Sequence, residues 1–218
     1  MKEIFSRIFS IEDKLATLNT VKHFDPFSDG LAEVDGKEFR FWNPTRSKMA
    51  AAIVRGIKDV PNLSNKKVLY LDIAHAYTAS HLSDVIDRGG IIYGVEFSER
   101  PFNDTLQLCK KYENIVPMLN DARKPETYYW VERVDIVYCD IAQTDQTDIA
   151  IRNCKEFLKK NGFLLLAIKA RSIDVTKPPN QIYREEIGKL QKDGFEVLDW
   201  KNLEPFEDAH AFIVARMQ

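Results

Sequence analysis

Three carboxylates, Glu96, Asp121 and Asp140, stand shortly after apolar runs that have the length of β-strands. In a sheet of parallel strands, ligands bind beyond the carboxyl ends of the strands, where the strand order reverses. There, Glu96 can accept hydrogen bonds from ribose hydroxyls, Asp121 can meet an adenine amino group, and Asp140 is expected beside the reacting centre. A single acid at a strand end often only caps a helix or faces solvent. Three acids that each follow a predicted strand favour a nucleotide-type site.

The turn that follows the first of these runs contains no glycine. Residues 71–78 read Leu-Asp-Ile-Ala-His-Ala-Tyr-Thr. Glycine is favoured in such a turn because the backbone must bend tightly and approach the ligand without a Cβ clash. The phosphate-binding pattern GxxxxGK[ST] is also absent. Patterning alone therefore predicts a nucleotide-type α/β domain and leaves its cofactor open.

Strand and helix patterns alternate around these acids from residue 43 onward. Apolar runs predict strands at 68–71, 91–95, 115–118, 134–139 and 163–168, and helical patterns separate them, the longest near 146–160. Near-continuous apolar strands between helices indicate a parallel sheet that is covered on both faces. The last two strands, 195–200 and 211–216, have only a loop between them, so we expect them to pair antiparallel. The fold class is α/β, with the Rossmann-like sheet and terminal antiparallel hairpin of S-adenosylmethionine-dependent methyltransferases.

The first 41 residues have a different pattern. Short segments at 3–9, 14–18 and 38–41 are separated by turn formers, and no helical period of useful length is present. The sequence predicts a small N-terminal β-domain over residues 1–41 and a methyltransferase domain over residues 42–218. At the junction, Asn43 is predicted to cap a helix whose first residue is Pro44.

The composition is that of a globular protein in a reducing compartment. Cys109, Cys139 and Cys154 have no CxxC spacing and are odd in number, so neither a disulfide framework nor a zinc site is expected. No apolar run approaches the roughly 20 residues that a membrane helix needs. The start of the chain also lacks the basic-then-apolar layout of a signal peptide. We expect a cytoplasmic protein with no membrane partner.

Several segments resemble the fibrillarin family. Two of them are Asn-Pro-Thr-Arg-Ser-Lys-Met-Ala at 43–50 and Asp-Ile-Ala-Gln-Thr-Asp-Gln at 140–146, and the others lie at 68–71, 78–84, 93–98, 120–123, 168–174 and 203–211. The resemblance runs in consistent order over about residues 39–216. It is specific because α/β patterning alone does not produce the motif that begins at Asp140. The short N-terminal unit, which has no Gly/Arg-rich tail, is similar to the archaeal form.

The resemblance implies an RNA 2′-O-methyltransferase that uses S-adenosylmethionine. It would be the catalytic subunit of a box C/D ribonucleoprotein, in which a guide RNA selects ribosomal or transfer RNA targets. The expected partners are a Nop-domain scaffold protein and a kink-turn-binding ribosomal-type protein. The catalytic Lys-Asp-Lys-His set of the family falls on Lys48, Asp140, Lys169 and His210. Cofactor-binding roles fall on Tyr77, Thr78, Glu96, Phe97, Asp121, Ala122, Asp140 and Gln143, and no metal is implied.

These residue types suit the chemistry that the resemblance implies. A ribose hydroxyl is a poor nucleophile until its proton is removed as it attacks the sulfonium methyl group. Lys169 can act as the base only if its pKa falls, and a nearby cation, Lys48, would lower it. Asp140 would orient Lys169, and His210 would position the ribose or the lysine.

The turn at 71–78 departs from the family, which has Leu-Gly-Ala-Ala-Ser-Gly-Thr-Thr there. Asp72 replaces a glycine and adds a carboxylate where the carboxylate of the cofactor is expected, at a cost on the order of 1–4 kcal/mol. Tyr77 is expected to add bulk over the pocket. Two functions remain open: an active guide-directed methyltransferase, and a cofactor-poor paralogue that is a structural subunit of the same particle. Retention of the four catalytic-type residues favours the first, and a dinucleotide dehydrogenase is disfavoured because GxGxxG is missing.

The charge balance predicts how RNA is held. The formal net charge is −2, whereas a protein that grips phosphates by itself normally has a clear basic surplus. Basic residues gather locally, at Arg46, Lys48, Arg55, Lys169 and Arg171. We therefore expect the isolated protein to bind RNA weakly and an assembly to present the RNA to it.

Overall fold

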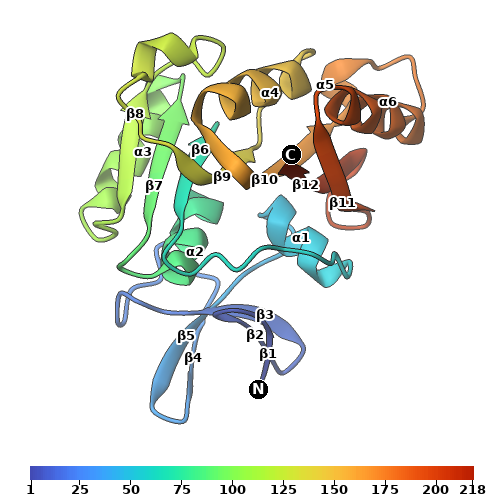
Figure 1. Cartoon of the computed structure of the whole chain (residues 1–218). Helices are drawn as coiled ribbons and strands as arrows, with labels where there is room; N and C mark the ends of the chain where they lie inside the picture. The colour runs from blue at the N-terminus through green and yellow to red at the C-terminus, as the bar shows by residue number, and fades with distance from the viewer.

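The chain folds around two β-sheets in a computed structural model that describes residues 1–218 (Figure 1). The smaller sheet is antiparallel, has five strands and lies below the larger one in this view. Its order is β1-β2-β3-β5-β4, formed by β1 (Lys2–Phe5), β2 (Ile8–Ile11), β3 (Lys14–Leu18), β4 (Leu31–Val34) and β5 (Lys37–Phe41). The predicted segment 3–9 is two strands, because the chain turns at Arg7, which has a positive φ of 62°. The predicted division of the chain into a domain of residues 1–41 and a domain of residues 42–218 stays a prediction.

The larger sheet has seven strands in the order β11-β12-β10-β9-β6-β7-β8. Neighbours from β10 to β8 pair parallel, and β12 pairs antiparallel with both β10 and β11, which confirms the predicted α/β class and terminal hairpin. The strand order reverses between β6 and β9. The strands are β6 (Lys67–Leu71), β7 (Ile91–Glu96), β8 (Ile115–Leu119), β9 (Val134–Cys139), β10 (Leu158–Lys169), β11 (Phe195–Asn202) and β12 (His210–Met217).

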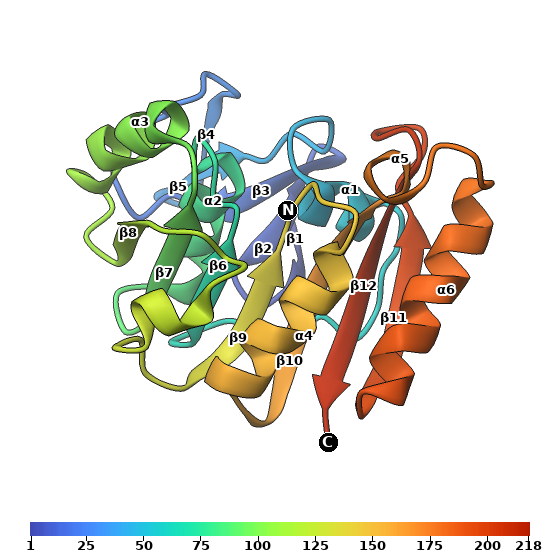
Figure 2. The same cartoon turned by 90° about the horizontal axis from the view of Figure 1, so that it is seen from above.

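Helices cover both faces of this sheet (Figure 2). Alternate strand residues contribute to two separate apolar cores, one packed against α1 and α2 and the other against α4 and α6. Burial on both faces explains why the strands are almost continuously apolar. The helices are α1 (Lys48–Val54), α2 (Tyr77–Ile86), α3 (Glu99–Cys109), a 3-10 turn η1 (Pro125–Tyr128), α4 (Gln146–Phe157), α5 (Ala170–Ile173) and α6 (Pro179–Lys192). None of them is long and apolar enough to cross a membrane.

Two predicted helix boundaries are wrong. Helix α1 begins at Lys48 and not at Pro44, because Ser47 is its N-cap and accepts a hydrogen bond from the Ala50 N–H. Asn43 instead accepts a hydrogen bond from the Thr45 N–H at 3.0 Å and closes a turn ahead of the helix. The helix predicted near 146–160 ends at Phe157, and the chain goes directly into β10.

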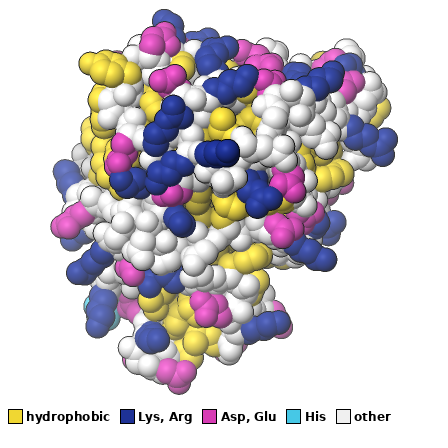
Figure 3. Space-filling view, viewed as in Figure 1, with side chains coloured by type: hydrophobic (Ala, Val, Ile, Leu, Met, Phe, Trp, Pro, Cys, Tyr) yellow, Lys and Arg dark blue, Asp and Glu magenta, His cyan; other side chains and the backbone are white.

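The face at the amino ends of the parallel strands carries charges of both signs (Figure 3). Many of its cations are paired with acids at the same edge of the sheet, and these ion pairs are Lys67–Glu132, Lys155–Asp193, Lys159–Asp135 and Arg216–Glu196. The charges of these four pairs are therefore largely neutralised within the face.

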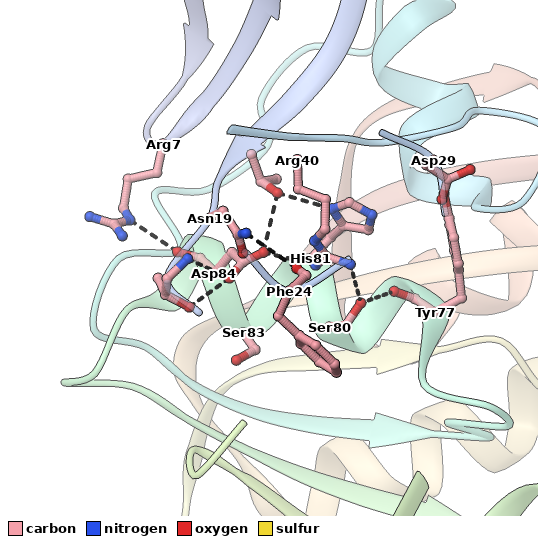
Figure 4. Close-up of polar contacts among 12 residues, drawn as sticks. Arg7, Asn19, Phe24, Asp29, Arg40, Tyr77, Ser80, His81, Ser83 and Asp84 are labelled. Atoms are coloured by element: carbon pink, nitrogen blue, oxygen red, sulfur yellow. Dashed lines mark hydrogen bonds and ion pairs between the residues drawn. The ribbon is translucent and has the colours of Figure 1, made fainter. Parts of the chain in front are cut away.

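A buried polar cluster joins the small sheet to α2 (Figure 4). Arg40 Nη2 donates to Asp84 Oδ2 at 2.8 Å, and both side chains are fully buried. The backbone N–H and the hydroxyl of Thr20 donate to the other Asp84 oxygen, at 3.1 and 2.6 Å. His81 stacks on Trp42, and burial together with the charge of Arg40 lowers its pKa well below the usual value, so the ring is neutral. The two sheets are therefore joined by a charged pair that water does not reach.

Candidate active site

The predicted catalytic residues come from α1, β9, β10 and β12. Asp140 directly follows β9, while Lys169 ends β10 and is the register partner of His210, which begins β12. Lys48 is the first residue of α1. The carboxyl ends of β9 and β10 and the amino end of the antiparallel β12 meet at one edge of the sheet, so residues far apart in sequence are brought together.

The Asp140 carboxylate lies between two ammonium groups. Its Oδ1 is 3.3 Å from Lys48 Nζ and 3.1 Å from Lys169 Nζ, and Lys169 Nζ also donates to the Asp140 carbonyl oxygen. The three side chains are only 15–16% exposed. Because the site is largely shielded from solvent, a carboxylate that binds two ammonium groups fixes the position of both.

His210 is linked to this group through Glu207, a residue that sequence reasoning did not single out. Glu207 lies 3.9 Å from Lys48 Nζ and 3.9 Å from His210 Nδ1. His210 Nδ1 also lies 2.5 Å from the Asp208 carbonyl oxygen, which can only accept, so Nδ1 carries a proton and Nε2 is the acceptor when the ring is neutral. The only sequence signal for Glu207 is its place three residues before His210 in the segment 203–211.

The expectation that the pKa of Lys169 falls is wrong for the protein by itself. Burial lowers the pKa of this amine, but the carboxylates of Asp140 and Asp72 raise it by more, and the net value lies above the ordinary one. Lys48 does not provide the expected repulsion because it pairs with the same Asp140 carboxylate. The ion pairs could not be predicted from residue spacing.

A cavity of about 280 Å³ opens beyond the carboxyl ends of β6 to β9. Of the eight predicted cofactor residues, those that line it are Glu96, Phe97, Asp121, Ala122 and Gln143, and Asp72, Asn120 and Arg123 also contribute. A larger hollow of about 830 Å³ lies at the far end of α2 and contains none of the predicted site residues. The smaller cavity is therefore the candidate binding site.

Polar groups in the cavity are fixed by the backbone. Glu96 is 3% exposed, and its two carboxylate oxygens accept hydrogen bonds from the N–H groups of Ala74 and Ser98 at 2.8 and 2.7 Å. Each oxygen keeps a lone pair for a further donor. Asp121 binds the guanidinium of Arg123, which holds the pKa of this acid below its usual value. The same guanidinium lies 5.6 Å from the centre of the exposed Phe97 ring, so Arg123 covers one side of the cavity, a role that the sequence did not indicate.

The turn between β6 and α2 has the positive φ angles that usually require glycine, although it contains no glycine. Asp72, Ala74 and Ala76 have φ angles of 65°, 50° and 58°, in the left-handed region that costs other residues on the order of 1–2 kcal/mol each. The N–H groups of residues 72 and 73 both donate to the Val95 carbonyl at 3.0 Å, and the Ala74 N–H donates to Glu96. Gly94 on β7 makes room, because a Cβ there would lie 2.4 Å from Ile73 Cδ1. Hydrogen bonds to β7 thus hold a strained turn in place.

Tyr77 and Thr78 do not reach the cavity with their side chains. The Tyr77 hydroxyl donates to Asp29 at 2.7 Å, and its ring lies 4.4 Å from the Arg46 guanidinium. The Thr78 hydroxyl donates to Ser47, the N-cap of α1, at 3.0 Å. The expectation that Tyr77 adds bulk over the pocket is therefore wrong, and both side chains instead contact segments that precede the large sheet.

Comparisons with known proteins agree with this geometry. A family model described as Fibrillarin matches residues 1–218. A fibrillarin-like rRNA/tRNA 2′-O-methyltransferase of Saccharolobus islandicus is 48% identical over 204 residues, which are 93% of this chain and 88% of the relative. The crystal structure of Aeropyrum pernix fibrillarin with natively bound S-adenosyl-L-methionine is 42% identical, with a TM-score of 0.89 over 98% of this chain and 96% of that one. A fibrillarin/Nop5p complex contains a chain that is 36% identical, with a TM-score of 0.89 and full coverage of both chains.

Proposed function

Because this chain belongs to the fibrillarin family, we propose that it is an S-adenosylmethionine-dependent methyltransferase that modifies the ribose 2′-hydroxyl of ribosomal and transfer RNA. The observation that carries the proposal is the Asp140 carboxylate between the amines of Lys48 and Lys169, at the same sheet edge as the cavity. This group can accept and stabilise a proton beside a bound nucleoside.

The residues of the cavity fit the cofactor. Glu96 has lone pairs left for ribose hydroxyls, Asp121 lies after β8 for an adenine amino group, and the exposed Phe97 ring offers a surface for the base. Asp121 is paired with Arg123 and Asp140 with two lysines, so Asp72 and Glu96 are the cavity acids that favour a ligand with positive charge. When bound, the cofactor supplies a sulfonium methyl group as the electrophile.

The chain's own residues handle the proton of the ribose hydroxyl. Lys169, once neutral, accepts that proton at Nζ as the oxygen becomes nucleophilic. Asp140 holds the resulting ammonium at 3.1 Å and keeps Lys48 on its other side. His210 presents Nε2 as an acceptor that can orient the ribose. Because these groups are held in place, the reaction does not carry the entropy cost of orienting free reactants in solution.

The geometry of the turn disfavours the cofactor-poor alternative. Loss of the glycines would disable the site if the backbone could no longer follow its tight path. Instead Asp72, Ala74 and Ala76 adopt left-handed conformations, and the Ala74 N–H orders Glu96. The turn therefore supports the cavity with the residues that this chain has.

The finer proposal is that the protein works in the cytoplasm as the catalytic subunit of a box C/D particle. The net charge of −2 supports a protein that does not capture RNA alone. The full-length similarity to a fibrillarin/Nop5p complex supports a Nop-domain partner. A kink-turn-binding protein and a guide RNA complete the proposed assembly.

We expect the isolated protein to bind target RNA weakly and without sequence preference, and to methylate it only in the assembly. A net charge of −2 leaves no overall basic surplus, so few counterions are displaced and the affinity at physiological salt is low. Gel-shift titration of the protein alone, followed by ribose-methyl mapping after addition of the partner proteins and guide, measures both. Exchanging the guide for one with a different complementary sequence should move the methylated position. Tight sequence-selective binding by the protein alone, or methylation that ignores the guide, would contradict the proposal.

A further inference from the structure

We propose that Asp72 is a specificity residue of the cofactor site and binds the α-ammonium group of the methionine part. The inference rests on the proposed function, because it takes the cavity at β6 to β9 to be the S-adenosylmethionine site. In this chain Asp72 stands where the sequence motif of the fibrillarin family has a glycine. The sequence alone suggested repulsion of the cofactor at this position, and the geometry points to attraction.

The Asp72 carboxylate lacks a close cationic partner. It lines the cavity, and its side chain is 37% exposed. The nearest cation, Lys169 Nζ, lies 3.9 Å away, which is beyond hydrogen-bonding distance, and this amine already donates to Asp140. A half-buried carboxylate without a charged donor is costly, and a ligand that brings such a donor is favoured there.

The charges around Asp72 decide whether the α-ammonium or the α-carboxylate group of the methionine part binds there. Glu96 at the end of β7 and Asp140 after β9 face Asp72 with negative charge, and Lys169 at the end of β10 faces it with positive charge. Burial raises the pKa of Asp72 to about 6, Lys169 opposes this rise, and Glu96 and Asp140 add to it. A ligand carboxylate would add another negative charge to this group, whereas an ammonium would neutralise one. The methionine part of the cofactor therefore places its ammonium at Asp72.

The backbone fixes the carboxylate for this role. The left-handed conformation at Asp72 is held by its N–H, which donates to the Val95 carbonyl at 3.0 Å. The neighbouring N–H of Ile73 donates to the same oxygen at the same distance. The position of Asp72 does not depend on the ligand, so a substitution that keeps the size of the side chain removes the charge and little else.

Calorimetric titration of two ligands isolates the contribution of Asp72. S-adenosylhomocysteine carries the ammonium group, and methylthioadenosine lacks the whole amino-acid part. At pH 7.5, Asp72→Asn should weaken S-adenosylhomocysteine on the order of 10- to 100-fold, the scale of a charged hydrogen bond, and leave methylthioadenosine unchanged. Asp72→Gly, the family's residue and one that suits the positive φ, should do the same. Asp121→Asn is the matched control, because it should weaken both ligands. Unchanged or tighter binding of S-adenosylhomocysteine by both Asp72 variants would overturn the inference.

The pH dependence gives a second readout. In the unaltered protein, affinity for S-adenosylhomocysteine should fall as pH drops below about 6, because protonation of Asp72 competes with the ligand's ammonium. Asp72→Asn should lose this part of the slope, while the contributions of Glu96, Asp140 and Lys169 stay common to both forms. Equal slopes would overturn the inference alone. Failure of the unaltered protein to bind either ligand would overturn the proposed function and the inference with it.

Discussion

Replacement of Lys169 by alanine is expected to lower methyl transfer by the assembled enzyme on the order of 10²- to 10⁴-fold, the contribution typical of a positioned general base. The amine acts on the ribose hydroxyl, so the loss should lie in the chemical step and should persist at saturating cofactor. Single-turnover transfer of a labelled methyl group, measured with saturating guide and target, reports the chemical step.

Lys169→Arg is the matched control for the base. It keeps the positive charge beside Asp140 but does not lose its proton, so it should be as inactive as the alanine variant. In the unaltered enzyme the pKa of Lys169 is raised, so the rate should increase with pH over the neutral and mildly alkaline range as the neutral amine becomes more common. Full turnover by either variant, or a flat pH profile, would remove Lys169 from the role of base.

The second large effect is expected in stability. Arg40→Met should lower the free energy of unfolding by about 3–5 kcal/mol, because it leaves the fully buried Asp84 carboxylate without its cation. Chemical denaturation monitored by tryptophan fluorescence measures the change. The double variant Arg40→Met with Asp84→Leu should recover much of the loss, since no buried charge is then left unpaired.

An exposed ion pair provides the comparison. Lys177 and Glu185 lie 2.8 Å apart, at nearly the same distance as Arg40 and Asp84, but both are well exposed. Lys177→Met should change stability little, because solvent screens such pairs. Equal effects of the Arg40 and Lys177 substitutions would contradict the account of the interface between the small sheet and α2.

The order of elements was predictable because the strands are buried on both faces. The apolar segment of β10 contains apolar residues at positions that point to either face of the sheet. The helices between the strands repeat their apolar residues every three or four positions. The acids Glu96 and Asp121 were predictable as part of the cavity for the same reason, since the end of a parallel strand fixes the edge on which its next residue lies.

The local chemistry of the site was less predictable. Spacing does not show that one carboxylate, Asp140, pairs with both lysines, and this pairing reverses the expected direction of the Lys169 pKa. Nor does it show that the Tyr77 hydroxyl finds Asp29 on a distant segment. The left-handed path at Ala74 and Ala76 depends on hydrogen bonds and space supplied by β7, which a local reading of the turn does not contain.

The central claim is that a turn without glycine forms the cofactor site of a working fibrillarin-type enzyme. Calorimetric titration of S-adenosylmethionine into the unaltered protein tests it most directly, with the double variant Asp72→Gly and Ala76→Gly for comparison. The account predicts saturable binding of one cofactor per chain, and no gain in affinity for the double variant, since the backbone already follows the required path and Asp72 contributes attraction. Absence of binding by the unaltered chain together with its appearance in the double variant would contradict the account and favour a cofactor-poor subunit.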